Sequence, residues 1–196
     1  TKTQIDSGLL TFVPDSNENG SSYNTFTFTV NDGTTDSASS YTMTVNVTAV
    51  NDAPTASNNT VTTNEDTDHT FAASEFGFTD VDGDSLDHVS IETLPSNGTL
   101  LLSGSAVSAG DQISAANISN LVFRPAANAN GASYDTFTFT VNDGTTDSAS
   151  SYTMTVNVTA VNDAPTVVND TDSVTEGGRS EEHTSELQSQ FRISYA

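Results

Sequence analysis

The chain has 196 residues, of which 26 are acidic and only 4 are basic, a formal net charge of −22, and no cysteine. This balance excludes nucleic acid as a partner, because few basic groups are present to neutralise phosphates, and it disfavours anionic membranes. The lack of cysteine excludes disulfides and thiolate metal sites, and without a long apolar run no membrane insertion is expected. Two interpretations of the charge remain: a disordered acidic chain, and a folded domain whose carboxylates bind cations. Blocks rich in Val, Phe, Thr and Tyr favour the folded domain.

The first feature along the chain is an internal repeat. The sequence from Thr25 to Thr55 recurs letter for letter from Thr136 to Thr166, 111 residues later. A period of this length fits a whole small domain rather than one turn of a solenoid. We therefore expect residues 1–52 to be the C-terminal part of a truncated repeat, 53–163 a complete repeat and 164–178 the start of the next. Tandem arrays supply reach or many equal binding sites, so no enzyme activity is predicted.

Within the complete repeat, apolar residues alternate with polar ones, which is the period of a β-strand with one buried and one wet face. The clearest strands are residues 136–141 and 152–160, where Phe, Val, Tyr and Met alternate with Thr and Asn. Shorter strands are predicted, in chain order, around Val61 and at 89–91, 100–102 and 121–123, and turn signals stand at 82–83, 95–98, 130–131 and 143–144. About seven strands in roughly 110 residues, without a convincing helix, predict an all-β fold, an antiparallel Greek-key β-sandwich.

The tail from Arg179 to Ala196 lacks this alternation and holds two of the four basic residues. Its segments Arg179–Ser189 and Ile193–Ala196 resemble the translation of a sequencing-library adapter. Residues 179–196 are therefore interpreted as a non-native segment and take no part in the fold prediction. The alternative is a short genuine helix, because the helix propensities of Arg179–Ser189 are compatible with one.

The sharpest chemical signal is the acidic loop from Thr79 to Asp87. Asp80, Asp82 and Asp84 stand at alternate positions, and Gly83 between two of them allows their oxygens to curl around one point. Hard cations such as calcium take about six to eight oxygen ligands. The loop is not an EF-hand, because its glycine stands at position 4 instead of 6 and its position 12 is an isoleucine. The alternative is a solvated acidic turn, although crowded aspartates repel each other unless a cation neutralises them.

The order of four motifs resembles the cadherin-like repeats of large bacterial surface adhesins of the tandem-repeat type. The motifs are Asn-Glu-Asp-Thr at 64–67, Asp-Val-Asp-Gly-Asp at 80–84, Phe-Thr-Val-Asn-Asp-Gly at 139–144 and Val-Asn-Asp-Ala-Pro at 161–165. The resemblance implies a cadherin- or immunoglobulin-like sandwich with Ca²⁺ bound at the junction between consecutive repeats.

The resemblance also implies which residues bind the ion. The junction before the complete repeat would use Asn51, Asp52, Asp80, Asp82, Asp84 and Asp143. The next junction would use Glu65, Asn162 and Asp163. The Leu-Asp-Arg-Glu segment of the animal cadherins has no counterpart here, so one or two ions per junction are expected instead of three.

Together these features predict a calcium-stiffened extracellular spacer repeat of a secreted or surface-attached bacterial adhesin that supports cell adhesion and biofilm formation. Facing carboxylates at a junction repel, so the array would hinge at each Asn-Asp-Ala-Pro step until calcium cross-links it. The expected partners are neighbouring repeats, through calcium junctions, and cell-surface or matrix glycans or proteins. The expected location is extracellular, at the cell surface.

Two alternatives stay open. One is an accessory repeat of a secreted hydrolase, which would use the same sequence. The other is a glycan-binding β-sandwich module, whose exposed aromatic candidates are Tyr23, Tyr41, Tyr134 and Tyr152, although alternation with Thr favours core or strand-edge positions for them. Catalysis is poorly supported, because no Gly-x-Ser-x-Gly turn occurs and the candidate side chains are scattered: Glu65, Glu75, Glu92, His69 and His88.

Overall fold

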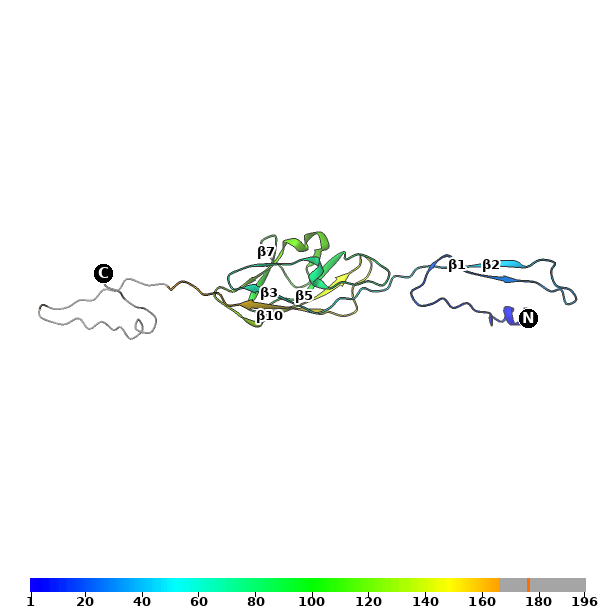
Figure 1. Cartoon of the computed structure of the whole chain (residues 1–196), viewed down its shortest axis with the longest axis horizontal. Coiled ribbons are helices and arrows are strands. Elements are labelled where there is room, and N and C mark those ends of the chain that lie inside the picture. The colour runs from blue at the N-terminus through cyan, green and yellow to red at the C-terminus, as the bar shows by residue number, and fades with distance from the viewer. Residues whose placement is uncertain (166–175, 177–196) are drawn as a thin grey trace. The chain divides into compact units, whose positions relative to one another are not determined.

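The computed structural model describes residues 1–165 and residue 176 (Figure 1). The chain divides into two units, Thr1–Val161 and Asn162–Ala196. The predicted start of a third repeat at 164–178 and the predicted adapter tail at 179–196 lie almost wholly outside the described residues. In the part of the chain that is described, no helix is long and apolar enough to cross a membrane.

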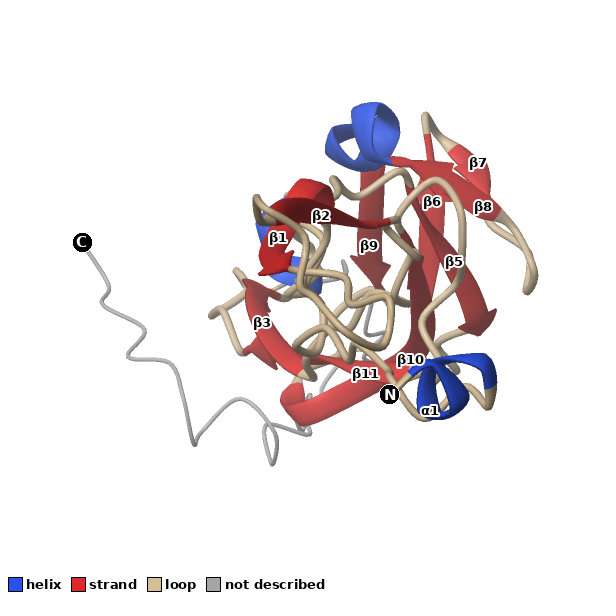
Figure 2. Cartoon of the chain, turned by 90° about the vertical axis from the view of Figure 1, so that its right-hand side faces the viewer, coloured by secondary structure: helices blue, strands red, loops and turns tan. Residues whose placement is uncertain are grey.

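The complete repeat folds as an all-β sandwich, as predicted from its alternating pattern. One sheet has five strands in the order β3-β11-β10-β5-β8, and the other has four in the order β4-β9-β6-β7 (Figure 2). Two short 3₁₀ helices, η1 (Ala73–Phe76) and η2 (Ala115–Asn120), connect strands. The strands are β3 (Asn59–Asn64), β4 (His69–Thr70), β5 (His88–Thr93), β6 (Gly98–Leu102), β7 (Ser105–Ala106), β8 (Gln112–Ser114), β9 (Leu121–Pro125), β10 (Gly131–Asn142) and β11 (Tyr152–Thr159).

The sheets are not antiparallel throughout, which corrects one detail of the predicted sandwich. Along the chain, β3 is the first strand of the five-stranded sheet and β11 is the last. These two strands lie side by side and pair in parallel, with Val61 opposite Val156. The other strand pairs within the domain are antiparallel. Because β3 and β11 run in the same direction side by side, the chain enters the domain at one end of the sandwich and leaves it at the other. This arrangement suits a domain joined in series to its neighbours.

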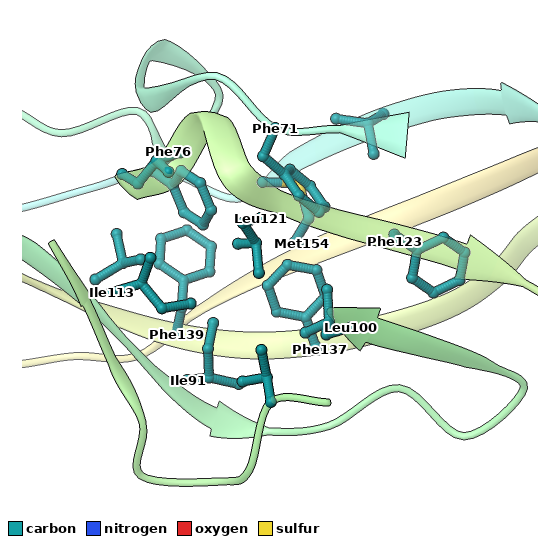
Figure 3. Packing of buried hydrophobic residues seen from close by; sticks show 14 of the residues in the cluster. Phe71, Phe76, Ile91, Leu100, Ile113, Leu121, Phe123, Phe137, Phe139 and Met154 are labelled. Carbon is teal, nitrogen blue, oxygen red and sulfur yellow. The ribbon is translucent and has the colours of Figure 1, made fainter. Parts of the chain in front are cut away.

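The core lies between the two sheets and is built from the alternating apolar residues. Phe137 and Phe139 of β10 are fully buried and meet Phe71 and Phe76 from the opposite layer (Figure 3). The rings of Phe76 and Phe139 lie edge to face with centroids 4.9 Å apart, and those of Phe71 and Phe137 do so at 5.6 Å. Burial of each such side chain contributes about 1.5–3 kcal/mol. The threonines that alternate with them on β10 face away from this core.

A buried carboxylate holds the turn before β6. Asp135, 6% exposed and next to a register shift in β10, accepts backbone N–H groups from Ser96 at 3.0 Å, Asn97 at 2.6 Å and Gly98 at 3.0 Å. Its Oδ1 also accepts the N–H of Thr136 at 2.9 Å. The charge of this carboxylate is therefore compensated by backbone donors, which are the partners a buried acid needs.

Residues 1–47 precede the strands of the sandwich in the chain. They begin with a five-residue helix that the sequence did not predict, α1 (Lys2–Asp6), capped reciprocally by Thr1 and Gln4. A two-stranded antiparallel hairpin follows, formed by β1 (Gly20–Phe28) and β2 (Tyr41–Val47). Its apolar side chains are exposed, among them Phe26, Phe28 and Met43.

Candidate metal centre

The acidic loop between η1 and β5 curls around Asp80. The backbone N–H groups of Asp82 and Asp84 both donate to Asp80 Oδ1, at 2.8 and 3.1 Å. Gly83 takes a φ of +84°, a left-handed conformation that favours glycine at this turn. As a result, Asp80, Asp82 and Asp84 each offer a carboxylate oxygen within 4.8 Å of the others, as the alternate spacing predicts.

This donor set fits a hard cation such as calcium. Two oxygens that bind one Ca²⁺ at about 2.4 Å can be no more than about 4.8 Å apart, and the three carboxylate oxygens meet this condition. Asp80 Oδ2 is buried and has no hydrogen-bond partner among the described residues. An acceptor that is shielded from solvent and lacks a donor is costly, and a cation would supply the missing partner.

The linker residues that precede the domain are bound to this same end. The backbone N–H of Asp52 donates to Asp82 Oδ2 at 2.7 Å. Asn51 Nδ2 donates to Asp143 Oδ2 at 3.0 Å. A little further on, Thr55 and Thr79 exchange both backbone hydrogen bonds at 2.8 Å. The structure therefore brings the predicted linker residues together with the acidic loop and with the end of β10.

Asp143 is a supporting group rather than a member of the three-carboxylate cluster. It is 8% exposed, and its Oδ1 accepts the N–H groups of Thr145 and Thr146, both at 2.7 Å. The hydrogen bond from Asn51, followed by that from the Thr146 backbone, holds the pKa of Asp143 below its ordinary value of 3.8. Asp143 therefore carries its negative charge at neutral pH beside the linker.

The residues predicted for the following junction are placed differently. Glu65 is 6% exposed; its Oε1 accepts the N–H of Val161 at 2.5 Å and its Oε2 accepts Nδ2 of Asn130 at 2.9 Å. These two bonds, that of Asn130 first, lower the pKa of Glu65. Both carboxylate oxygens are thus engaged inside the domain. Asn162 and Asp163 belong to the second unit, where both are exposed, so a junction with Glu65 stays a prediction from sequence.

His69 and His88, two of the chain's three histidines, both have carboxylate neighbours. His69 Nε2 lies 3.3 Å from Glu75 Oε2. His88 Nδ1 lies 2.8 Å from Asp87 Oδ2, and its Nε2 lies 3.9 Å from Asp147 Oδ1. The adjacency of Asp87 and His88 was a usable signal in the sequence, whereas Asp147 comes from a distant segment and gave none.

Comparison with known proteins places this site within a family. Residues 51–159, more than half of the chain, match the sequence profile of the family described as Bacterial Ig domain. The matched region begins at Asn51 and therefore includes both linker residues, Asn51 and Asp52. No curated protein and no solved structure gave a significant match. Domains of this family are non-catalytic and usually occur in surface or extracellular proteins, and the chain belongs to this family.

Proposed function

We propose that this member of the bacterial Ig domain family is a spacer repeat of a secreted or surface-attached bacterial adhesin, stiffened by Ca²⁺ at the junction around Asn51. The observation that carries the proposal is the buried, unpartnered Oδ2 of Asp80 within a cluster of three carboxylates. Other domains of the same protein would bind glycans or proteins of a cell surface or matrix and so mediate adhesion and biofilm formation.

The chemistry supplied by calcium is charge neutralisation at a place where carboxylates crowd. Asp80, Asp82 and Asp84 would hold the ion. Asn51 and Asp52 tie the incoming chain to this cluster through Asp143 and Asp82, so binding at the loop would also restrain the linker. Without neutralisation, the repulsion among these aspartates favours an open loop and a freer linker.

The architecture supports a role as a spacer that extends the protein along one axis. The parallel pairing of β3 with β11 places the entry and exit of the chain at opposite ends of the domain. The longest strand, β10, has 12 residues and therefore spans about 40 Å at about 3.4 Å per residue. Identical segments recur at a domain-length period, so consecutive domains would add their lengths along one axis.

An extracellular location follows from the same chemistry. Calcium sites of extracellular modules bind with dissociation constants of about 10⁻⁴–10⁻³ M, which matches the plentiful calcium outside the cell. Folding linked to such weak binding would be completed only after export. Neighbouring repeats are the direct partners in this proposal, because each junction is built from two of them.

The test is calcium binding by the whole chain. We expect isothermal titration with Ca²⁺ to give heat and a dissociation constant of about 0.1–1 mM. We also expect the Tm of the chain to be higher at about 10 mM Ca²⁺ than in chelator. An excess of about 100-fold over the dissociation constant stabilises the native state by about 2.7 kcal/mol. Absence of both the heat and the Tm shift would end the proposal.

A pair of variants assigns the effect to the acidic loop. Asp84→Asn removes one charge from a carboxylate that accepts no hydrogen bond among the described residues, so it should fold normally while its Tm shift with calcium falls by more than half. Glu92→Gln on β5 removes one charge from an exposed strand position and should keep the full calcium response. Equal losses in the two variants would point to nonspecific counter-ion binding.

A further inference from the structure

Strand β3 is an edge strand that lacks the protection given to the other edges of the sandwich. The two sheets end in β3 and β8, and in β4 and β7 (Figure 2). β8, β4 and β7 have three, two and two residues, whereas β3 has six. Proteins commonly prevent an edge from pairing with another chain by keeping it short, or by placing charges, proline or a bulge on it. β3 has no charged residue and no proline, and its ladder with β11 has no register shift.

The backbone of β3 presents a defined set of groups along this edge. The N–H of Glu65 donates to the C=O of Thr159 at 2.9 Å, which fixes the side of the strand that faces β11. Successive residues of a strand point their N–H and C=O groups to opposite sides, so every second residue before Glu65 also faces β11. The residues between them face the free edge: Thr60, Thr62 and Asn64.

Two of these edge groups already have partners inside the domain. The N–H of Thr60 donates to Asn59 Oδ1 at 2.8 Å. The C=O of Asn64 accepts the N–H of Thr67 at 3.2 Å. In the described part of the chain, the edge therefore keeps the C=O of Thr60, the N–H of Asn64 and both groups of Thr62 for another strand.

We propose that β3 is an interaction surface for β3 of a second copy of this chain, paired antiparallel about a two-fold axis at Thr62. In this register the two Thr62 residues exchange both hydrogen bonds, and the N–H of Asn64 donates to the C=O of Thr60 in each direction across the axis. Every available edge group finds a partner, while the two engaged groups, Thr60 N–H and Asn64 C=O, fall opposite each other. A two-fold contact requires a surface that is complementary to itself, and this edge meets that condition.

The charge of the chain also favours this edge. Two copies with a net charge of −22 repel, but neither β3 nor its neighbour β11 carries a charged residue. Glu65, which follows β3, would lie opposite Asn59 of the second copy, and its carboxylate is bonded inside its own domain. Few hydrogen bonds form at one contact, so each contact is weak, and repeats in series would add such contacts between two neighbouring arrays. This lateral contact is separate from the calcium junctions, which join repeats within one chain.

The chain has no cysteine, so one introduced thiol reports the register. Two Thr62→Cys chains would place their thiols opposite each other with Cβ atoms about 5.5 Å apart, and dibromobimane, a short reagent that bridges two thiols, should link them. Thr60→Cys chains should not link to one another, because the two positions are offset by about 14 Å. A mixture of Thr60→Cys and Asn64→Cys chains should link, since these positions lie opposite each other. Linkage of Thr60→Cys to itself as efficient as that of Thr62→Cys would overturn the proposal.

Sedimentation velocity over a range of protein concentrations measures the strength of the contact. In chelator and about 0.15 M salt, where charges more than about 8 Å apart are screened, we expect a monomer–dimer equilibrium. Thr62→Pro should raise the dissociation constant at least about tenfold, because it removes the N–H that faces the second copy, and proline is tolerated at such an edge position. Thr62→Glu should also raise it, by placing like charges opposite each other. Thr136→Glu on β10 adds the same charge two strands from the edge and should leave the dissociation constant unchanged.

Two results of the sedimentation experiment would contradict the pairing. One is a chain that is monomeric at every concentration, and the other is a dimer that the two Thr62 variants weaken no more than Thr136→Glu does. If circular dichroism shows that Thr62→Pro does not fold, the two Glu variants decide. Because the measurement is made in chelator, failure of this pairing and failure of the calcium proposal are distinguishable.

Discussion

The hairpins β1–β2 and β10–β11 are built from nearly the same residues and have the same strand register, but they meet different surroundings. Their end turns are also alike, since Gly33 donates to Asn31 Oδ1 and Gly144 to Asn142 Oδ1, both at 2.7 Å. Among the described residues, the second hairpin is covered by the other strands of a sandwich and the first is not. Strand pairing and turns therefore depend on local sequence, whereas burial depends on the rest of the domain.

The two hairpins also differ in one polar contact. Asp32 and Asp143 accept the same two backbone N–H groups of their turns at 2.7–2.9 Å. Within the part of the chain that the structure describes, Asp143 alone receives a further hydrogen bond, from Asn51 of the linker. Each position of the second hairpin from Thr136 onward therefore has an internal control in the first, where the same substitution meets the same local sequence without the tertiary contact.

The largest expected difference concerns the core. Phe137→Ala should lower the free energy of unfolding by about 3–5 kcal/mol, because a fully buried ring leaves a cavity. Phe26→Ala, the same change in the exposed hairpin, should alter it by less than about 1 kcal/mol. Urea unfolding of the whole chain, followed by circular dichroism, measures both. Comparable losses would mean that the first hairpin is buried in solution.

A smaller difference is expected for the buried carboxylate. Asp135→Asn should cost about 2 kcal/mol in the same unfolding experiment, since backbone donors of the 95–98 turn lose a charged acceptor. Asn24→Asp should leave the stability unchanged, because no such turn contacts the first hairpin among the described residues. If Asn24→Asp stabilised the chain instead, a partner for the first hairpin would have to be present already.

The linker contact predicts a difference in calcium response. Asp143→Asn should weaken calcium binding about tenfold, because groups that position ligands commonly contribute that much to metal affinity. Asp32→Asn should leave the binding isotherm unchanged, since Asp32 has no contact with the linker among the described residues. Calorimetric titration of the two variants beside the parent chain decides this. A matched loss in both would show that general negative charge, and not the Asn51 contact, controls binding.

The strands that could be predicted are those long enough to show a period. The alternation was visible at 136–141 and 152–160, within β10 and β11, and the apolar faces of these strands are buried as expected. The two-residue strands β4 and β7 were not predicted, because a period of two cannot be recognised in a single step. The parallel pairing of β3 with β11 could not be predicted either, because the alternation of apolar and polar residues is the same in parallel and antiparallel strands.

In the candidate site, contacts within one loop could be predicted from the sequence, whereas contacts between distant segments could not. Sequence spacing alone predicts that Asp80, Asp82 and Asp84 converge, because they are neighbours in one loop. The contact between Asn51 and Asp143 joins segments far apart in sequence and came only from a family resemblance. The role of Asp135 was missed, although aspartate is depleted in strands and its presence inside a run of Thr and Phe was a signal that it serves a special contact.

The smallest expected difference is in acid. The pKa of Asp143 is lowered by its hydrogen bonds, so its ionised form contributes stability above the ordinary value of 3.8, and this is lost as pH falls through the lower folded-state value. The urea midpoint of the chain should therefore fall below about pH 4, and Asp143→Asn should make that fall shallower. The pKa of Asp32 is also lowered, first by the N–H of Thr35, but this contact lies in the exposed hairpin. Asp32→Asn should therefore leave the acid dependence of the sandwich unchanged, and an equal flattening in both variants would show that the two hairpins unfold as one unit.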